Sequence, residues 1–330
     1  MTRGVAVVTG ASAGVGRATA VELALAGFEV ALLARGRAGL KGAAAEVGAA
    51  GGRALRLEVD VADWDAVDEA ATRVEDELGP IDLWVNAAMT TVFGAVADVS
   101  AAEIRRTTEV TYLGQVHGTL AALARMRPRD RGRIVNVGSS LAFVGIPLQA
   151  AYCGAKFAVR GFTESVRAEL LADGSAVSIA QVHLPAMDTP QFDWCESKLP
   201  RRAMPVPPIY APEVGAHAIV RAAVDDRVVS DVVGSWNRAI VALDRVAPGV
   251  IARFAAATAV ESQQTDEPER PRIANLEQPV DETDDAGTRG RFGARAGGVL
   301  DPTFLAGLPA TVVHLARAAA AELRQLTPWG

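Results

Sequence analysis

The sequence predicts an α/β fold in which a doubly wound parallel sheet of about seven strands is covered by helices on both faces. Between residues 4 and 180, short and continuously apolar runs alternate with longer amphipathic runs. Continuous apolar strands are typical of a parallel sheet that is buried on both faces. Right-handed crossovers between such strands give a Rossmann-type architecture. An irregular and helical C-terminal extension is expected to follow it.

The elements can be assigned in order from the apolar runs and from the glycines that separate them. Several predicted helices stop at glycine, at Gly27, at Gly51 and at Gly79, because glycine readily adopts the backbone conformation that ends a helix. We expect strands at 5–9, 30–34, 54–59, 81–86, 133–137, 177–183 and 228–233. We expect helices at 16–26, 38–50, 64–78, 101–126, 151–171 and 212–224, and another at 236–257 that breaks at Pro248.

The chain divides into a catalytic domain at 1–240 and a C-terminal extension at 241–330. Within the domain, the proline-rich stretch 190–210 is predicted to be a mobile lid over a substrate. The extension contains an acidic loop at 261–298, rich in proline and glycine, which we expect to be irregular or partly disordered. A terminal helix is expected at about 309–326, with Val312, Leu315 and Leu323 on one face.

Composition excludes several classes of function. The net charge is -6, and residues 261–290 contain nine acidic residues against three arginines, so there is no basic stripe for nucleic acid. No apolar run is long enough to span a membrane, and we expect no signal peptide. With only two cysteines, Cys153 and Cys195, a reduced and cytoplasmic setting is expected. The histidines and cysteines show no metal-ligand spacing, so no metal is expected.

A glycine-rich turn lies between the first strand and the first helix, in the pattern T-G-x-x-x-G-x-G at 9–16. Glycines here allow a tight turn and let the backbone approach a pyrophosphate, whose charge is stabilised at the helix N-terminus. The pattern therefore predicts a dinucleotide site. Its members are Gly10, Ser12, Ala13, Gly14, Val15 and Gly16.

The same turn also matches G-x-S-x-G, the nucleophile elbow of α/β-hydrolases. A serine hydrolase using Ser12 would need a downstream base, for which His183 and His217 are the candidates. An elbow normally follows a central strand deep in the chain, and this hypothesis leaves the other motifs unexplained. The serine hydrolase is therefore the remote alternative.

The end of the second strand indicates which nicotinamide cofactor is bound. Folds that prefer NAD place an acidic residue there to accept from the ribose 2′-hydroxyl, but this chain reads Leu33-Ala34-Arg35. The guanidinium of Arg35 can pair with a 2′-phosphate, and Ser12 and Arg17 could add to that site. These residues predict NADP(H).

Tyr152 and Lys156 begin a long helix at positions i and i+4, so the phenol and the ammonium lie on one face. A nearby cation favours the phenolate, and we therefore expect a lowered pKa for Tyr152. Such a phenol would be suited to acid–base catalysis near neutral pH. The pair alone is weakly specific, since similar pairs are common on helix surfaces.

Together, the motifs resemble the short form of the short-chain dehydrogenase/reductase family over residues 4 to about 225. The resemblance rests on the glycine turn at 9–16, on Asp60-Val61 and Asn86 after the third and fourth strands, and on Ser139 with Tyr152 and Lys156. The order and spacing of these motifs are more specific than any one of them. The resemblance implies a hydride transfer between nicotinamide and a substrate carbon.

The resemblance also implies a role for each matching residue. Tyr152 would be the acid/base, Ser139 would hydrogen-bond the substrate oxygen, and Lys156 would bind the nicotinamide ribose and tune Tyr152. Ser139 lies 13 residues before Tyr152, the spacing usual in the family, and is favoured over Ser140. The cofactor would also contact Asp60, Val61, Asn86, Ala87, Pro185 and Thr189.

The chain departs from the family pattern at three places. The usual N-N-A-G is Asn86-Ala87-Ala88-Met89, and the usual Pro-Gly after the sixth strand is Pro185-Ala186. The usual helix asparagine of the proton relay is Thr111, which would preserve the relay through its backbone carbonyl. The first alternative function is thus a non-catalytic NADP(H)-binding protein that senses redox state or binds a partner, although binding alone does not require Tyr152.

The predicted substrate pocket is mostly apolar, which favours a neutral and fairly hydrophobic ketone or secondary alcohol. Its candidate walls are Leu141, Gln149, Met187, Phe192 and Trp194, with Thr90, Thr91 and Phe143. Family members commonly pair through the two long helices, here at 101–126 and 151–171. The resemblance therefore implies a homodimer or homotetramer.

Overall fold

The computed structural model describes residues 3–297. The terminal helix expected at about 309–326 lies outside this range. Within it, no helix is both long enough and apolar enough to cross a membrane.

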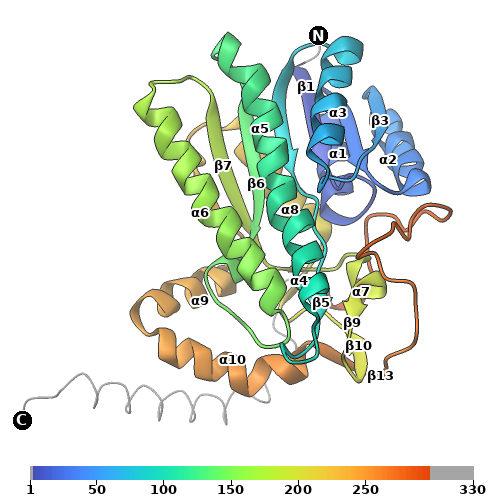
Figure 1. Ribbon diagram of the computed structural model, residues 1–330, viewed down its shortest axis with the longest axis vertical. Helices are drawn as coiled ribbons and strands as arrows, with labels where there is room; N and C mark the ends of the chain where they lie inside the picture. The colour runs from blue at the N-terminus through green and yellow to red at the C-terminus, as the bar shows by residue number, and fades with distance from the viewer. Residues whose placement is uncertain (1–2, 298–330) are drawn as a thin grey trace, which may run out of the picture.

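A seven-stranded parallel sheet forms the centre of the fold (Figure 1). Its strands in chain order are β1 (Gly4–Thr9), β2 (Phe28–Ala34), β3 (Ala54–Glu58), β4 (Ile81–Asn86), β6 (Arg133–Ser139), β7 (Ser178–Leu184) and β12 (Ser230–Val232). Their spatial order is β12-β7-β6-β4-β1-β2-β3. The order reverses between β1 and β4, so the predicted doubly wound fold is confirmed, and the crevice at this switch point is where such folds bind ligands.

Helices cover both faces of the sheet, and each face has its own apolar core. One face carries α1 (Gly14–Leu25), α2 (Arg37–Ala49) and α8 (Pro212–Val224), and the other carries α3 (Trp64–Leu78), α4 (Ala101–Thr108), α5 (Gly114–Met126) and α6 (Ala150–Ala172). Successive side chains of β1 point to opposite faces of the sheet. Val5 and Val7 belong to one core and Ala6 and Val8 to the other, so helices are needed on both faces.

The long helix expected at 101–126 is divided into three parts. A capping box at Ser100 and Glu103 begins α4. A π-helical turn at Glu109–Leu113 then joins α4 to α5. Turns of this kind inside α-helices occur frequently at functional sites, and this one contains Thr111.

The chain after β7 is more ordered than the sequence suggests. The predicted lid contains α7 (Gln191–Trp194), β9 (Glu196–Ser197), β10 (Arg201–Ala203) and β11 (Ile209–Tyr210). Two of these short strands pair with β5 (Val92–Phe93) and β8 (Ala186–Met187). Short 3-10 turns also lie before β7, at Arg127–Arg129 and Ser140–Ala142, and near the end of the described chain, at Gly293–Arg295.

The described chain after β12, residues 233–297, packs at the carboxyl ends of the sheet strands (Figure 1). It contains α9 (Ser235–Val246), α10 (Pro248–Ser262) and β13 (Gln264–Pro268), with the expected break at Pro248. The strand β13 pairs antiparallel with β10, which corrects the prediction that the acidic loop begins as irregular chain at 261. Pairing with a strand about sixty residues earlier leaves no local signal in the sequence.

Candidate active site

A cavity opens at the carboxyl ends of the central strands, where the fold predicts a ligand site. The following residues of the predicted cofactor set line it: Gly10, Ser12, Ala13, Gly14, Val15, Gly16, Arg35, Asp60, Val61, Ala87, Pro185 and Thr189. Ser139, Tyr152 and Lys156 line it too. Residues far apart in the sequence are thus brought to one cavity by the topology of the sheet.

The turn after β1 is shaped for a close approach of backbone to a ligand. Gly10 has φ +68° and Gly14 has φ +56°, a left-handed conformation that favours glycine. A Cβ atom at Gly16 would lie 2.2 Å from the carbonyl oxygen of Gly10. The turn could not keep this shape with larger residues at these positions.

Ser139, Tyr152 and Lys156 form a connected group at the inner end of the cavity. Tyr152 and Lys156 lie in the first two turns of α6, and Ser139 ends β6. The Ser139 side chain is hydrogen-bonded to the Tyr152 phenol. The Lys156 Nζ atom donates to the Val137 carbonyl oxygen over 2.8 Å and lies 5.6 Å from the Tyr152 ring centroid.

Burial dominates the proton affinity of both groups on α6. It lowers the pKa of Lys156 to about 7, and it raises the pKa of Tyr152 above its ordinary value despite the hydrogen bond with Ser139. The expectation of a lowered Tyr152 pKa is therefore wrong for the protein alone. A lysine that has itself been pushed towards neutrality by desolvation stabilises a phenolate less than the sequence argument assumed.

The two candidate serines point to different partners. The Ser139 hydroxyl bonds with Tyr152 and also accepts from the Leu141 backbone N–H over 3.1 Å. The Ser140 hydroxyl donates to the Leu184 carbonyl oxygen over 3.3 Å. This geometry favours Ser139 as the serine that acts together with Tyr152.

Asn86 lies in the core below the cavity and is not among the residues that line it. Its amide nitrogen donates to the Asn136 side chain over 2.8 Å and to Thr119 over 3.2 Å, and its oxygen accepts from the Trp84 indole over 2.8 Å. These contacts join β4, β6 and α5. Asn86 therefore supports the floor of the site from below and does not line the cavity in which the resemblance implies a cofactor.

Thr111 also lies outside the cavity wall. Its hydroxyl accepts from the Thr90 N–H over 2.9 Å and donates to the Thr90 carbonyl oxygen over 2.7 Å. The hydroxyl is thus used to hold the chain after β4 against the π-helical turn. A relay through the Thr111 backbone carbonyl, which the resemblance implies, stays a prediction.

Arg35 and Asp60 occupy the adenosine end of the cavity but are engaged with other parts of the protein. The Arg35 guanidinium lies 4.0 Å from the Asp60 carboxylate. It also donates to the carbonyl oxygens of Leu276 and Glu277, over 3.4 Å and 3.0 Å. Asp60 forms an ion pair with Arg106 of α4. The sequence did not predict that the C-terminal extension would reach this end of the cavity.

The substrate end of the cavity is apolar. All five principal predicted wall residues line it, namely Leu141, Gln149, Met187, Phe192 and Trp194. Thr90, Thr91 and Phe143 do not. Phe143 packs on His183, with 4.6 Å between ring centroids.

Sequence reasoning missed a large part of this wall. Helices α9 and α10 contribute Trp236, Asn237, Ile240, Ile251, Phe254, Ala255, Thr258 and Ala259. Their spacing on two successive helices indicated apolar faces, but nothing local indicated which part of the body those faces cover. Helices α9 and α10 therefore form a wall of the site, and α9 begins before the domain boundary predicted at 240.

The histidines that a serine hydrolase would need have other partners. The His183 ring nitrogen Nδ1 lies 3.2 Å from the Ser139 carbonyl oxygen, and burial lowers the pKa of His183 to about 4. His217 is exposed and pairs with Glu22 over 2.9 Å. Ser12 has neither base beside it, so the geometry gives the hydrolase hypothesis no support.

Comparison with known families agrees with this geometry. Residues 4–198, which include the glycine turn and the group around Tyr152, match the short chain dehydrogenase family. The chain belongs to the short-chain dehydrogenase family. The matched span ends before α9 and α10, so part of the cavity wall lies beyond it.

Two similar proteins have names that denote oxidoreductases. The chain is 34% identical over 275 residues to the uncharacterized oxidoreductase YxnA of Bacillus subtilis, covering 81% of this chain and 76% of that protein. It is 35% identical over 191 residues to 3-dehydrosphinganine reductase of Danio rerio, covering 56% of this chain and 57% of that protein.

A solved member of the family has a similar structure. The alcohol dehydrogenase of Thermococcus sibiricus, complexed with 5-hydroxy-NADP, matches with a TM-score of 0.59 and 25% identity. The match covers 69% of this chain and 94% of that chain.

The residues present fit the nicotinamide cofactor of a short-chain dehydrogenase. A Cβ atom at Gly10 would lie 2.7 Å from the Ala88 backbone, so glycine is needed there for the turn to lie against the chain after β4. Lys156, Thr189 and the turn at Gly14 are at hand in the cavity wall to hold the ribose, the carboxamide and the pyrophosphate. When bound, the nicotinamide would supply or accept the hydride.

Proposed function

We propose that the protein is an NADP(H)-dependent oxidoreductase that interconverts a neutral, fairly hydrophobic ketone and its secondary alcohol. The observation that carries the proposal is the bonded pair of Ser139 and Tyr152, with Lys156 beside it, at the inner end of an apolar cavity. Membership of the short-chain dehydrogenase family supports oxidoreductase chemistry.

The protein's own residues would carry the proton chemistry of this reaction. In the direction of reduction, the Tyr152 phenol donates its proton to the substrate carbonyl oxygen, and the Ser139 hydroxyl donates a hydrogen bond to the same oxygen. Lys156 holds Tyr152 and the ribose in place. Because the phenol keeps its proton when buried, it is poised to act as the acid.

The apolar wall supports the choice of substrate class. Phe192, Ile240, Phe254 and Trp236 line the cavity, and burial of apolar substrate surface against such side chains favours binding. The names of two relatives agree with this class, since they are a 3-dehydrosphinganine reductase and an alcohol dehydrogenase. A panel of neutral ketones assayed by NADPH oxidation tests the proposal, and wild-type protein that binds NADPH and oxidises it with none of them would refute it.

Cofactor preference can be tested at Arg35. The absence of an acid at Ala34 and the guanidinium that follows support NADP(H) over NAD(H). We expect Arg35→Ala to weaken NADPH binding by about tenfold or more, because a charged hydrogen-bond donor is lost, and to leave NADH nearly unchanged. Fluorescence titration measures both, with Arg53→Ala, an exposed arginine paired with Glu29, as the control. Equal losses for both cofactors would contradict the NADP(H) preference.

We further propose that the protein forms a homodimer or homotetramer through α5 and α6 and works in the cytoplasm. Leu120 of α5 and Phe157 of α6 are 45% and 44% exposed, and large apolar surfaces of this kind favour association. Both cysteines are free thiols, buried in the fold.

We expect Leu120→Asp to shift the oligomer to a monomer, because it puts a charge into the apolar contact. Light scattering after size-exclusion chromatography measures this, and Leu25→Asp, at an exposed position of α1, is the control. A wild-type monomer would contradict the proposed assembly.

A further inference from the structure

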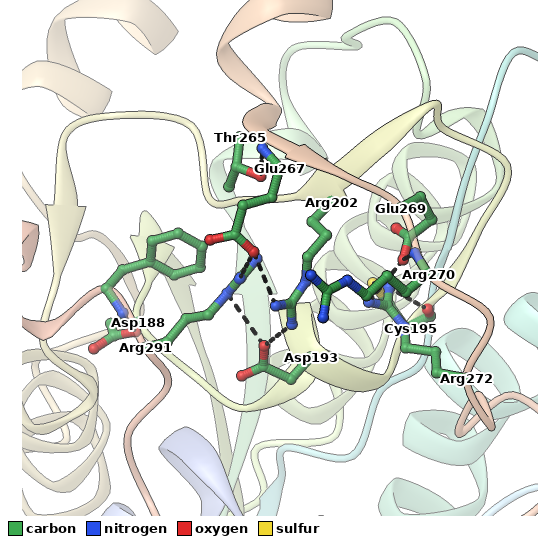
Figure 2. Close-up of polar contacts among 11 residues, drawn as sticks. Asp188, Asp193, Cys195, Arg202, Thr265, Glu267, Glu269, Arg270, Arg272 and Arg291 are labelled. Carbon is green, nitrogen blue, oxygen red and sulfur yellow. Dashed lines mark hydrogen bonds and ion pairs between the residues drawn. The ribbon is translucent and has the colours of Figure 1, made fainter.

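Residues 272–291 form a strap that is held at both ends, by contacts with the lid and with β13. At one end, Arg272 donates to the Cys195 carbonyl oxygen over 3.1 Å. At the other end, Arg291 pairs with Asp193 and Glu267, over 3.2 Å and 3.3 Å. Figure 2 shows Arg202 and Arg291 reaching these two acids from different segments, and Figure 1 shows the red strap running on beside the end of α2. The strap is therefore a fixed loop over the cavity's adenosine end.

The strap occupies the N-terminus of α2. The Ala38 and Gly39 N–H groups donate to the carbonyl oxygens of Glu282 and Asp281, over 3.2 Å and 3.1 Å. The Arg37 N–H donates to the Glu282 carboxylate over 3.2 Å. No side chain of α2 itself caps this end. The donors that would attract a phosphate are thus already bound by the protein's own chain.

The strap also reaches the glycine turn and α1. The Gly14 N–H donates to the Gly287 carbonyl oxygen over 3.2 Å. The Arg17 guanidinium donates to the Asp285 carboxylate over 3.0 Å. Arg17 was the second arginine that the sequence nominated for the cofactor phosphate. With Arg35 on the strap's carbonyl oxygens as well, both arginines have strap partners.

Asp281 places a carboxylate at the centre of these contacts. Its side chain lies in the cavity wall with Ser12 and Gly36, and only 6% of the residue is exposed. A Cβ atom at Gly36 would lie 1.8 Å from its Oδ1 atom, and one at Gly39 would lie 2.3 Å from Oδ2 and 2.8 Å from the Ser12 Cβ. Its Oδ2 atom has no hydrogen-bond partner. A buried carboxylate, with one oxygen that has no hydrogen-bond partner, therefore lies near Arg35, where the 2′-substituent of the cofactor's ribose is expected.

We infer that the strap is an intramolecular competitor of the cofactor's phosphates, with Asp281 as the residue that sets the affinity for the 2′-phosphate. This inference rests on the proposed dependence on NADP(H). The 2′-phosphate and the Asp281 carboxylate are both anions. The donors of Arg35 and of the start of α2, which the phosphate requires, are bound by the strap's carbonyl oxygens and by the Glu282 carboxylate. Both cofactors compete with Gly287 for the Gly14 N–H, but only NADP(H) brings a 2′-phosphate against Asp281 and must displace that part of the strap.

Titration of the full-length protein with four ligands tests this inference. The ligands are NADPH, NADH, adenosine 2′,5′-bisphosphate and AMP. We expect Asp281→Asn to tighten binding of the two ligands with a 2′-phosphate by about tenfold, since removing one nearby like charge is worth about one power of ten. Binding of NADH and AMP should change by less than about twofold.

Asp284→Asn is the matched control, since it removes the same charge from an exposed position of the strap. It should leave all four dissociation constants near their wild-type values. An unchanged or weakened affinity of Asp281→Asn for the 2′-phosphate ligands would overturn the inference. Wild-type preference for NADH would instead overturn the proposed cofactor, and the inference would still be decided by the change that Asp281→Asn produces with the 2′,5′-bisphosphate.

Amide hydrogen exchange gives an independent readout of displacement. Peptides covering 276–290 should exchange faster when NADPH is added, and less so with NADH. Displacement releases Asp285 from Arg17, and this carboxylate accepts from the Gly287 N–H of the strap over 3.1 Å. Slower exchange of these peptides on addition of NADPH would mean that the strap closes over the cofactor, and that result would overturn the competition.

Discussion

Tyr152→Phe should lower kcat for ketone reduction by about a thousandfold, which is within the range that a positioned acid or base contributes. The substitution removes only the hydroxyl that bonds with Ser139, and the ring stays in the buried wall of the cavity. The dissociation constant of NADPH should therefore change by less than about twofold. Steady-state kinetics together with a fluorescence titration separate the two effects.

Tyr112→Phe is the control. Tyr112 packs edge-on against Phe162, with 6.3 Å between the ring centroids, and it does not line the cavity. It should keep wild-type kcat. If Tyr152→Phe also kept it, the assignment of the acid would be wrong. If the wild-type protein bound NADPH and turned over no carbonyl substrate, the redox-sensing alternative would replace the enzyme.

Lys156→Met should reduce kcat/KM by about a hundredfold or more, because it removes the cation that positions Tyr152 and would hold the cofactor ribose. It should also change how stability depends on pH. The pKa of Lys156 is about 7 in the fold and about 10.4 in an unfolded chain. Between these values the unfolded chain binds one more proton, so wild-type stability rises with pH relative to the variant.

Urea unfolding of both proteins at several values between pH 6.5 and 9.5 measures this difference. At the acidic end the wild type carries the full cost of a buried ammonium, and Lys156→Met should gain most there. The advantage of the variant should shrink steadily as pH rises. Burial also raises the pKa values of Cys153 and Cys195. Both thiols are present in both proteins, so their contributions cancel in the difference of unfolding free energies. A pH-independent difference would contradict the depressed pKa of Lys156.

Local patterns were sufficient to predict the catalytic half of the site. The glycine turn, Ser139 and the Tyr152–Lys156 pair are signalled by spacing within single strand–turn–helix units, and the parallel sheet brings such units to one edge. Asn86 was assigned to the correct strand end. Its side chain turns inward because the buried side chains of Trp84, Thr119 and Asn136 offer it hydrogen bonds.

The rest of the site depends on contacts between distant segments. The partners of Arg35 lie about 240 residues away in the chain, and no periodicity or spacing connects the two. The wall formed by Trp236 and Phe254 likewise depends on contacts between segments that lie far apart in the chain. The predicted pKa of Tyr152 was wrong for the same reason. The sequence shows that Lys156 is close, but the burial that raises the pKa of Tyr152 is produced by the whole fold.

The origin of the cavity walls implies a division of labour along the chain. Acid–base groups and the glycine turn lie within residues 4–198, whereas Trp236, Ile240 and Phe254 come from helices that follow this span. Substitutions on the inner faces of α9 and α10 can therefore change which carbonyl compounds are accepted while the reacting groups keep their geometry. Selection can therefore change the substrate range without changing the catalytic groups. For the same reason, α9 and α10 are the helices in which to redesign substrate range.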